Sequence, residues 1–361
     1  MDRNGAVRSL RGRGRVNDLS QAMLAPTLAL AVPLRRPWLL ADIGGTNARF
    51  GWLGAGASEV AHVATLRVDD HPGPAAAARA YLADLATQLA GDFEAPRAAA
   101  FAVATAVAGD SVALTNSGWA FSRAATRHEL ALDELLILND FEALALSLPR
   151  LRAGQWRAVD QLARPQPPAG AALAVIGPGT GLGVSGIVAT PHGWAAVPGE
   201  GGHASLSAAN DFEAAVLAAV RDLYEHVSAE RLLSGIGLPV LHAAVAEVLG
   251  QPAAALSAEA IVERGLAGAD EACSRSIDTF CDLLGSFAGN VALTLGARGG
   301  VYIGGGIVPR LGERFFASGF RERFEAKGRF RPYLQAIPTA LITDTLAALT
   351  GAALALEQHG R

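Results

Sequence analysis

Asp140 is the side chain in this sequence whose surroundings best suit a general base. An apolar run, residues 135–138, precedes Asn139 and Asp140, and an amphipathic segment follows them. This pattern predicts a buried strand, a polar stop and a helix, and open α/β sheets place ligands at such strand ends. There Asp140 could accept the proton of an attacking hydroxyl while Asn139 hydrogen-bonds the same or a neighbouring hydroxyl. The pair could equally be an ordinary helix N-cap, which Asp and Asn favour.

Further polar side chains that could bind a hydroxyl-rich ligand occur in three short segments. Glu200 and His203 lie three residues apart among glycines, without the cysteine cluster or second histidine that a metal site would need. Glu230 follows Ser228 and could instead be a first-turn helix acid with Ser228 as its cap. Asn116 could equally be a turn residue. Carboxylates, amides and an imidazole together suit a neutral ligand such as a sugar.

Two glycine-rich turns occur in strand–turn–strand patterns, with Thr180 placed 134 residues after Thr46. They predict two β-hairpins and a duplicated α/β plan. Glycines at such tips let backbone N–H groups approach an anion, so two facing hairpins could hold a polyphosphate. Either could instead be only a tight turn. The residues predicted to contact phosphates are Gly44, Gly45, Thr46, Asn47, Gly177, Gly179, Thr180 and Gly181.

Asp42 interrupts the apolar strand that enters the first of these turns. Burial of an unpaired carboxylate is costly in free energy, so we expect a functional or structural role for this residue. Beside a phosphate-binding turn it would hold Mg²⁺, through water, since this ion keeps much of its hydration shell. A third cluster, Gly304, Gly305 and Gly306, follows another apolar strand and would let a nucleoside ring lie close to the backbone. Helix–strand packing explains that cluster almost as well.

Composition excludes several classes of protein. The chain has 361 residues, 51% of them apolar, which is enough for a large core and two or three domain-sized units. Its formal net charge of −4 argues against a protein that binds nucleic acid through a basic surface. Cys273 and Cys281 cannot form a disulfide framework or a cysteine-rich zinc site, so a reducing, cytoplasmic setting fits best.

The basic residues are 29 arginines and one lysine, Lys327. A P-loop needs its lysine beside a glycine-rich turn, and a protein kinase needs one on an early strand. Lys327 stands near neither. Both of these ways of binding a nucleotide are therefore excluded.

Two stretches depart from the rest of the chain. Residues 1–37 carry a net charge of +5 and read as a basic, disordered extension, with translation from Met23 as the alternative. Their short apolar core resembles a secretory signal only weakly, so we expect no export. Residues 165–199 carry no charge, but their glycines and prolines favour two buried strands over a membrane span.

Taken together, these motifs resemble those of bacterial glucokinases, which belong to the superfamily of hexokinases, actins and heat-shock ATPases. The likeness runs from about residue 38 to residue 355. Its motifs occur in the family's order, and jointly they are highly specific. They comprise residues 41–49, 138–141, 177–183, 198–203, 228–235 and 304–310.

The resemblance implies an α/β protein with a duplicated actin-like ATPase (ribonuclease H-like) fold and two domains around a cleft. Residues 38–150 would form the small α/β domain, joined by a C-terminal helix at about 344–361, and residues 151–343 the large one. It also implies a homodimer.

The implied reaction is ATP-dependent phosphorylation of D-glucose to glucose 6-phosphate, with Asp140 as general base and Mg²⁺ as the accompanying ion. The two glycine-rich hairpins and Asp42 would hold the Mg-ATP phosphates, and Gly304, Gly305 and Gly306 would lie by the nucleoside. The implied glucose contacts are Asn116, Asn139, Asp140, Glu200, His203 and Glu230.

Residues 343–351 depart from the family pattern, in which a turn containing Asn, Pro and Gly is more usual. This departure leaves the nucleotide contacts of the site open.

Three other functions fit the sequence less well. A sugar-kinase relative with a cysteine-rich zinc motif would need more than the two cysteines present. A sugar-responsive regulator would need a helix-turn-helix before Asp42, and a chaperone-like ATPase would not need Glu200, His203 and Glu230.

Overall fold

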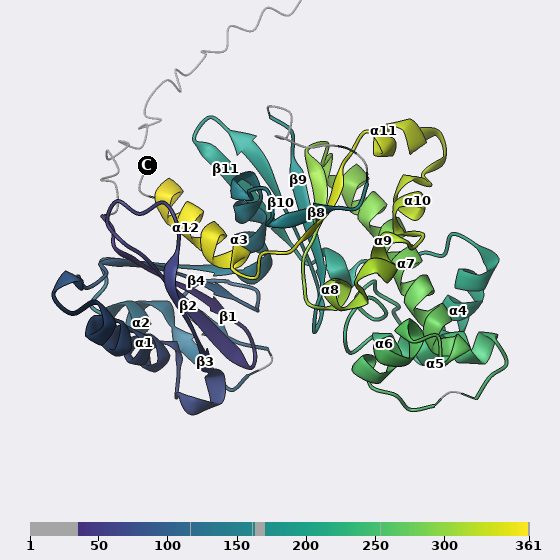
Figure 1. The fold of residues 1–361 in the computed structure, drawn as a ribbon, viewed down its shortest axis with the longest axis horizontal. Helices are drawn as coiled ribbons and strands as arrows, with labels where there is room; N and C mark the ends of the chain where they lie inside the picture. The colour runs from purple at the N-terminus through teal and green to yellow at the C-terminus, as the bar shows by residue number, and fades with distance from the viewer. Residues whose placement is uncertain (1–34, 116, 161, 163–169, 253, 360–361) are drawn as a thin grey trace, which may run out of the picture.

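The computed structural model describes residues 35–359 except 116, 161, 163–169 and 253. Two mixed sheets, a small two-stranded sheet of β5 and β6, and the helices make up this part of the chain (Figure 1). None of its helices is both long and apolar enough to cross a membrane. Of the predicted extension, residues 1–34 and their expected disorder lie outside the described residues. Arg36 is described, and its guanidinium lies 2.8 Å from the Glu357 carboxylate.

The first sheet has the strand order β3-β2-β1-β4-β7. Strands β1, β2 and β3 form an antiparallel meander, and β4 and β7 run parallel to β1. The bounds are β1 Trp38–Ile43, β2 Asn47–Leu53, β3 Ala61–Arg67, β4 Ala98–Val103 and β7 Glu134–Asn139.

The second sheet repeats this order as β11-β10-β9-β12-β13 and adds β8 at its edge. Its first three strands are again antiparallel, and β12 and β13 run parallel to β9. The duplicated plan is therefore present in the strand order, with one glycine-rich hairpin at the same place in each sheet. The bounds are β8 Trp156–Ala158, β9 Leu173–Pro178, β10 Leu182–Thr190, β11 Gly193–Gly199, β12 Gly300–Ile303 and β13 Thr339–Ile342.

The helices and the short elements fill the remaining layers. The helices are α1 Pro74–Leu89, α2 Arg123–Glu129, α3 Asp140–Ser147, α4 Asp211–Arg221, α5 Leu238–Val248, α6 Ala258–Leu266, α7 Glu271–Leu295, α8 Ile307–Leu311, α9 Glu313–Phe316, α10 Phe320–Glu325, α11 Arg331–Gln335 and α12 Ala347–His359. The short elements are β5 Ser111–Ala113, β6 Ala120–Ser122, η1 Val68–Asp70, η2 Ala90–Asp92, η3 Leu148–Arg150, η4 Gly201–His203 and η5 Gly328–Phe330.

Helices α3 and α12 lie between the two sheets (Figure 1). One buried apolar cluster joins Leu40 of β1, Val175 of β9, Leu146 of α3 and Leu349 of α12. The two helices approach so closely that a side chain at Gly351 would overlap the Ala143 carbonyl. Helix α3, and with it Asp140 at its first position, is thus held from both sheets.

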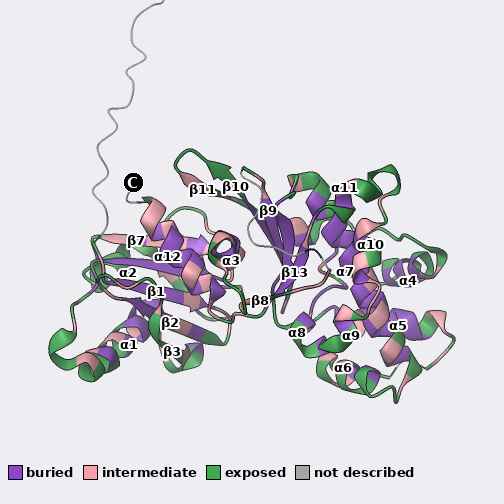
Figure 2. Ribbon diagram, turned by 45° about the horizontal axis from the view of Figure 1, so that its top comes forward, coloured by how far each residue is buried: buried purple, intermediate pink, exposed green. Residues whose placement is uncertain are grey.

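Two further apolar clusters cover the outer faces. Tyr81 and Leu85 of α1 pack on Phe50 and Phe101 of the first sheet. The long helix α7 is buried along most of its length between the second sheet and the outer helices (Figure 2). Both cysteines lie in α7 and are free and buried.

Candidate active site

The parallel strands of the first sheet bring two carboxylates to one edge. Ile43 pairs with Val103, and Val103 pairs with Asn139, so that β1, β4 and β7 end side by side. Asp42 is the penultimate residue of β1, and Asp140 directly follows β7. The predicted strand, polar stop and helix at this position are confirmed.

Asn139 is the N-cap of α3, as the alternative interpretation predicts. Its Oδ1 accepts hydrogen bonds from the Phe141 and Glu142 amides at 2.9 and 3.3 Å. Its Nδ2 donates to the Thr105 carbonyl, which follows β4, at 3.2 Å. These three bonds fix the start of α3 relative to the sheet, and they leave Asp140 as the helix's first residue rather than its cap.

The pKa of the Asp140 carboxyl lies near neutral pH. Burial raises the pKa of its carboxyl to about 7, and the negative charges of Asp42 and Glu200 act in the same direction. The Phe141 amide, which donates to its Oδ1 at 2.9 Å, opposes the shift. A carboxylate with such a pKa can accept a proton from a hydroxyl and return it to water at physiological pH.

Asp42 belongs to the same electrostatic group. Burial raises the pKa of its carboxyl, and the nearby Arg49 guanidinium opposes that rise. Among the described residues no group of three or more His, Cys, Asp or Glu side chains is placed to hold a metal. A Mg²⁺ ion that keeps its waters and is held chiefly by phosphate oxygens would not need such a group.

The tip of the β1–β2 hairpin is open to solvent. The Gly44 amide donates to the Asn47 carbonyl at 2.9 Å, and the Val68 amide donates to the Thr46 carbonyl at 2.9 Å. These bonds close the turn, while Gly45 remains half-buried and Thr46 exposed. The tip is therefore preformed and accessible to an anion.

The tip of the β9–β10 hairpin is bonded to the loop that carries Glu230. The Leu182 amide donates to Glu230 Oε2 at 2.8 Å, and the Gly235 amide donates to the Gly179 carbonyl at 2.7 Å. A side chain at Gly181 would overlap the Glu230 carboxylate. The packing of Glu230 therefore explains why position 181 is a glycine, whether or not Gly181 also binds a phosphate.

Two other glycines of this hairpin lie against the ring of Phe141. A Cβ at Gly177 or at Gly183 would overlap that ring. Phe141 is the residue after Asp140, so the second hairpin packs directly against the start of α3. Sequence reasoning missed Phe141, because no local pattern indicates that an aromatic ring fills the space above two distant glycines.

The third glycine cluster packs against the second hairpin. The Gly304 amide donates to the Ile176 carbonyl at 2.7 Å. Gly305 has a φ of +78°, and a side chain there would overlap the Pro178 carbonyl. Close packing of two turns therefore requires glycine at position 305, whereas a Cβ at Gly306 would meet no atom within 4 Å.

Glu200 and His203 lie on the loop after β11, and Glu230, on the loop between α4 and α5, lies next to His203. His203 ends the turn η4, and its Nε2 lies 3.8 Å from Glu230 Oε1. The Glu230 amide donates to the Gly202 carbonyl at 2.8 Å, and the His203 amide to the Glu200 carbonyl at 3.0 Å. Glu230 stands in a turn rather than a regular helix, although Ser228 Oγ does accept from the Arg231 amide at 3.2 Å. Asn116 lies outside the described residues.

Arg49 is a second residue that sequence reasoning missed. It faces Asp42 in the register of the β1–β2 hairpin, and its Nη1 lies 3.4 Å from Asp42 Oδ2. The signal was present in the sequence, because a four-residue tip between the two strands would place these positions opposite each other.

Comparisons with known proteins were consistent over nearly the whole described chain. The family model described as Glucokinase matches residues 39–359. The glucokinase of Aromatoleum aromaticum is 50% identical over 321 residues, which cover 89% of this chain and 95% of that one.

Solved structures agree with the match. The crystal structure of a glucokinase from an Antarctic psychrotroph has a TM-score of 0.81 at 37% identity, covering 89% of this chain and 98% of that one. A Streptomyces griseus ROK-family glucokinase, solved with glucose and AMPPNP, shares the fold at a TM-score of 0.57 and 19% identity, with 88% and 98% covered. By its family match and its identity to these relatives, the chain belongs to the glucokinase family of enzymes.

Proposed function

We propose that this enzyme transfers the terminal phosphoryl group of ATP to the 6-hydroxyl of D-glucose and so forms glucose 6-phosphate and ADP. The observation that carries the proposal is the position of Asp140, at the first turn of α3 and beside Asp42, with a pKa of about 7. Asp140 would accept the proton of the 6-hydroxyl as its oxygen bonds to the γ-phosphorus and the bond to the ADP oxygen breaks.

The sugar would be held by the polar group around Asp140. Glu200 interacts electrostatically with Asp140, and His203 and Glu230 lie together on the neighbouring loops. Asn139 uses Oδ1 for the helix and one hydrogen of Nδ2 for Thr105, so its second amide hydrogen can still bind a hydroxyl. Asn116 completes the proposed set.

The phosphates would lie against the two hairpin tips. The proposed contacts are Gly44, Gly45, Thr46, Asn47, Gly177, Gly179, Thr180 and Gly181, with Gly304, Gly305 and Gly306 beside the nucleoside. The ATP analogue bound to the Streptomyces griseus enzyme supports ATP as the donor. Asp42 fits a hydrated Mg²⁺, because its carboxylate adds to the negative charge around Asp140, and the Arg49 guanidinium approaches only one of its oxygens, at 3.4 Å, among the described residues. When bound, Mg²⁺ would neutralise phosphate charge.

The finer fold assignment belongs to the same proposal. The repeated strand order supports an actin-like ATPase fold of two domains, residues 38–150 with the C-terminal helix and residues 151–343, around a cleft. Closure on glucose would exclude water that could otherwise hydrolyse ATP. Small-angle scattering should then show a smaller radius of gyration with glucose than without it, and an unchanged radius counts against closure.

A coupled assay with glucose and ATP tests the reaction, and Asp140→Asn tests its base. We expect this variant to bind glucose within a few-fold of the parent and to lose roughly 10²–10⁴ in kcat. Asp133→Asn is the control, because Asp133 lies next to the opposite end of β7, where it pairs with Arg97 on the surface. Near-parental turnover of Asp140→Asn removes this residue from the mechanism.

Hexose range, donor preference, assembly and location need their own measurements. A panel of hexoses against ATP, ADP and polyphosphate defines the substrates. A homodimer remains a prediction of the family resemblance, and a cytoplasmic location remains a prediction from the two cysteines. Light scattering on the purified protein tests the dimer, and cell fractionation tests the location.

A further inference from the structure

Arg49 connects Asp42 to a distant part of the chain. Its Nη1 donates a hydrogen bond to the Thr345 carbonyl at 2.8 Å and lies 3.4 Å from Asp42 Oδ2. Thr345 belongs to the segment between β13 of the second sheet and α12. Of the two interactions of Arg49, the hydrogen bond to the Thr345 carbonyl is the shorter. The interaction with Asp42 is mainly an attraction between opposite charges.

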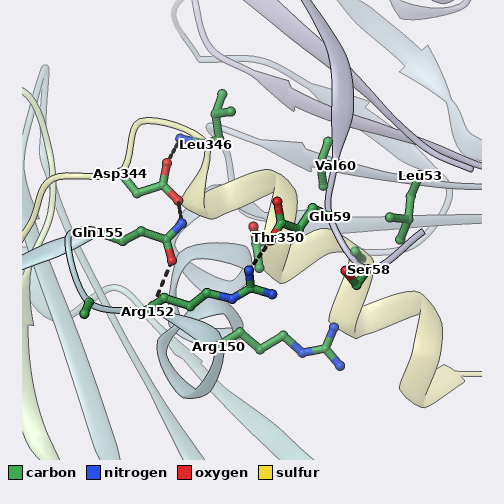
Figure 3. Close-up of a pocket in the computed structure, with 12 residues that line it drawn as sticks. Leu53, Ser58, Glu59, Val60, Arg150, Arg152, Gln155, Asp344, Leu346 and Thr350 are labelled. Carbon is green, nitrogen blue, oxygen red and sulfur yellow. Dashed lines mark hydrogen bonds and ion pairs between the residues drawn. The ribbon is translucent and has the colours of Figure 1, made fainter. Parts of the chain in front are cut away.

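The chain passes between the two sheets at two crossovers, residues 151–155 and residues 343–346, and hydrogen bonds join them. The Thr343 and Asp344 amides donate to the Gln155 carbonyl at 2.9 and 3.1 Å. Gln155 Nε2 donates to Asp344 Oδ2 at 2.7 Å, and the Leu346 amide donates to Asp344 Oδ1 at 2.8 Å (Figure 3). These bonds fix the segment on either side of Thr345.

Side-chain packing beside the two crossovers leaves a cavity. A cavity of about 380 Å³ lies beside them, between the loop after β2 and the start of α12, with Gln155 and Asp344 in its wall (Figure 3). Thr345 itself is exposed, and the Arg49 guanidinium, which bonds to its carbonyl, connects this crossover to Asp42 of β1.

We infer that Arg49 is a positioning residue that ties the Asp42 carboxylate to the crossover at Thr345. This inference rests on the proposed function, in which Asp42 serves the Mg-ATP phosphates. A shift of the crossover would move the guanidinium and with it the charge facing Asp42. The nucleotide side of the reaction would then respond to the relative position of the two sheets, whereas the loop that carries Glu200 and His203 makes no contact with Arg49 among the described interactions.

The test compares Arg49→Met and Arg49→Lys with a matched surface control. Methionine removes the charge and the donor at similar length, whereas lysine keeps a charge but has no fork that can serve two acceptors at once. Arg79→Met removes an exposed arginine that pairs with Glu129 on the same half of the protein. Calorimetry measures binding of glucose alone and of Mg-AMPPNP alone, and steady-state kinetics supply KM and kcat for both substrates.

We expect Arg49→Met to weaken Mg-AMPPNP binding and kcat/KM for MgATP by about tenfold or more, with the Kd for glucose within about threefold. Arg49→Lys should recover part of the loss, and Arg79→Met should change neither. Mg-AMPPNP binding within about twofold of the parent overturns the inference, as does an equal loss of glucose binding, which would indicate a merely structural role.

Gln155→Leu keeps the inference testable if Arg49→Met does not fold. It breaks the bond to Asp344 without touching Asp42 and should weaken Mg-AMPPNP binding in the same direction, by less. An unchanged affinity in that variant also counts against the inference. If the parent binds Mg-AMPPNP but does not phosphorylate glucose, the proposed function fails, and the binding comparison still decides the role of Arg49.

Discussion

Glu230 Oε2 accepts a hydrogen bond from the Leu182 amide at 2.8 Å, which joins the loop between α4 and α5 to the tip of the second hairpin. Its other carboxylate oxygen lies 3.8 Å from His203 Nε2. One side chain thus connects residues predicted to bind the sugar with residues predicted to bind the phosphates. Its loss should affect both stability and substrate binding, and two substitutions separate these effects.

Glu230→Gln retains an oxygen for the Leu182 amide, and Glu230→Ala does not. We expect the alanine variant to lose about 1–3 kcal/mol of unfolding free energy, because a buried amide loses its acceptor. The glutamine variant should be nearly as stable as the parent, with a raised KM for glucose. Urea denaturation and steady-state kinetics measure the two effects, and equal stability of the two variants would contradict the hydrogen bond's role.

The pKa of Asp140 predicts the acid limb of the pH profile. Its carboxyl must be ionised to accept a proton, and its pKa is raised from 3.8 to about 7. Below that pH, kcat/KM for glucose should therefore fall, approaching tenfold per pH unit. Glu200→Gln removes one charge that raises this pKa and should move the limb to lower pH. A limb near pH 4 in the parent enzyme would contradict the raised pKa of Asp140.

The same shift predicts a stability effect of opposite sign to that of an ordinary ion-paired aspartate. Between about pH 4 and pH 7 the folded state keeps the Asp140 proton that the unfolded state has lost. This contribution to the unfolding free energy is complete below pH 4 and disappears as the pH rises through 7. Asp140→Asn should therefore flatten the pH dependence of stability in this window, and a profile identical to that of the parent would refute the assignment.

Gly183 and Gly179 of the second hairpin should respond differently to alanine. A Cβ at Gly183 would overlap the Phe141 ring, so Gly183→Ala should cost about 1–3 kcal/mol and displace the start of α3. A Cβ at Gly179 meets no atom within 4 Å, and its φ lies outside the left-handed region. Gly179→Ala should leave stability unchanged and raise KM for MgATP. Thermal unfolding and nucleotide kinetics distinguish the two.

Asn139→Ala tests the cap of α3. Removal of the side chain leaves the Glu142 amide without its acceptor and should lower stability by about 0.5–2 kcal/mol. Because Asp140 is the next residue, kcat should fall as well. Ser257→Ala is the control, since it removes the corresponding cap of α6, where Oγ accepts from the Ala260 amide at 3.2 Å. A similar loss of stability with full activity in both variants would show that the cap does not position Asp140.

Local sequence patterns predicted much of the scaffold and some of the site. Alternating apolar residues and glycine turns indicated the β1–β2 and β9–β10 hairpins, and the polar stop after an apolar run indicated the start of α3. Such signals act over a few residues, which is why they can be read without coordinates. They did not indicate the bond between Arg49 and Thr345, which lie 296 residues apart.

The amino-acid sequence by itself determined the family, the two glycine-rich hairpins and the aspartate at the strand end, because motifs and side-chain periodicity are local properties. Only the tertiary structure decided that Phe141 fills the space above Gly177 and Gly183, that Glu230 binds the second hairpin and that Arg49 bonds to a crossover. The first and last of these contacts depend on how α3 and α12 pack between the two sheets, and the second on how the loop between α4 and α5 packs against β10. Such packing brings together residues that lie far apart in the sequence, and local sequence patterns do not indicate which of them will be close in space.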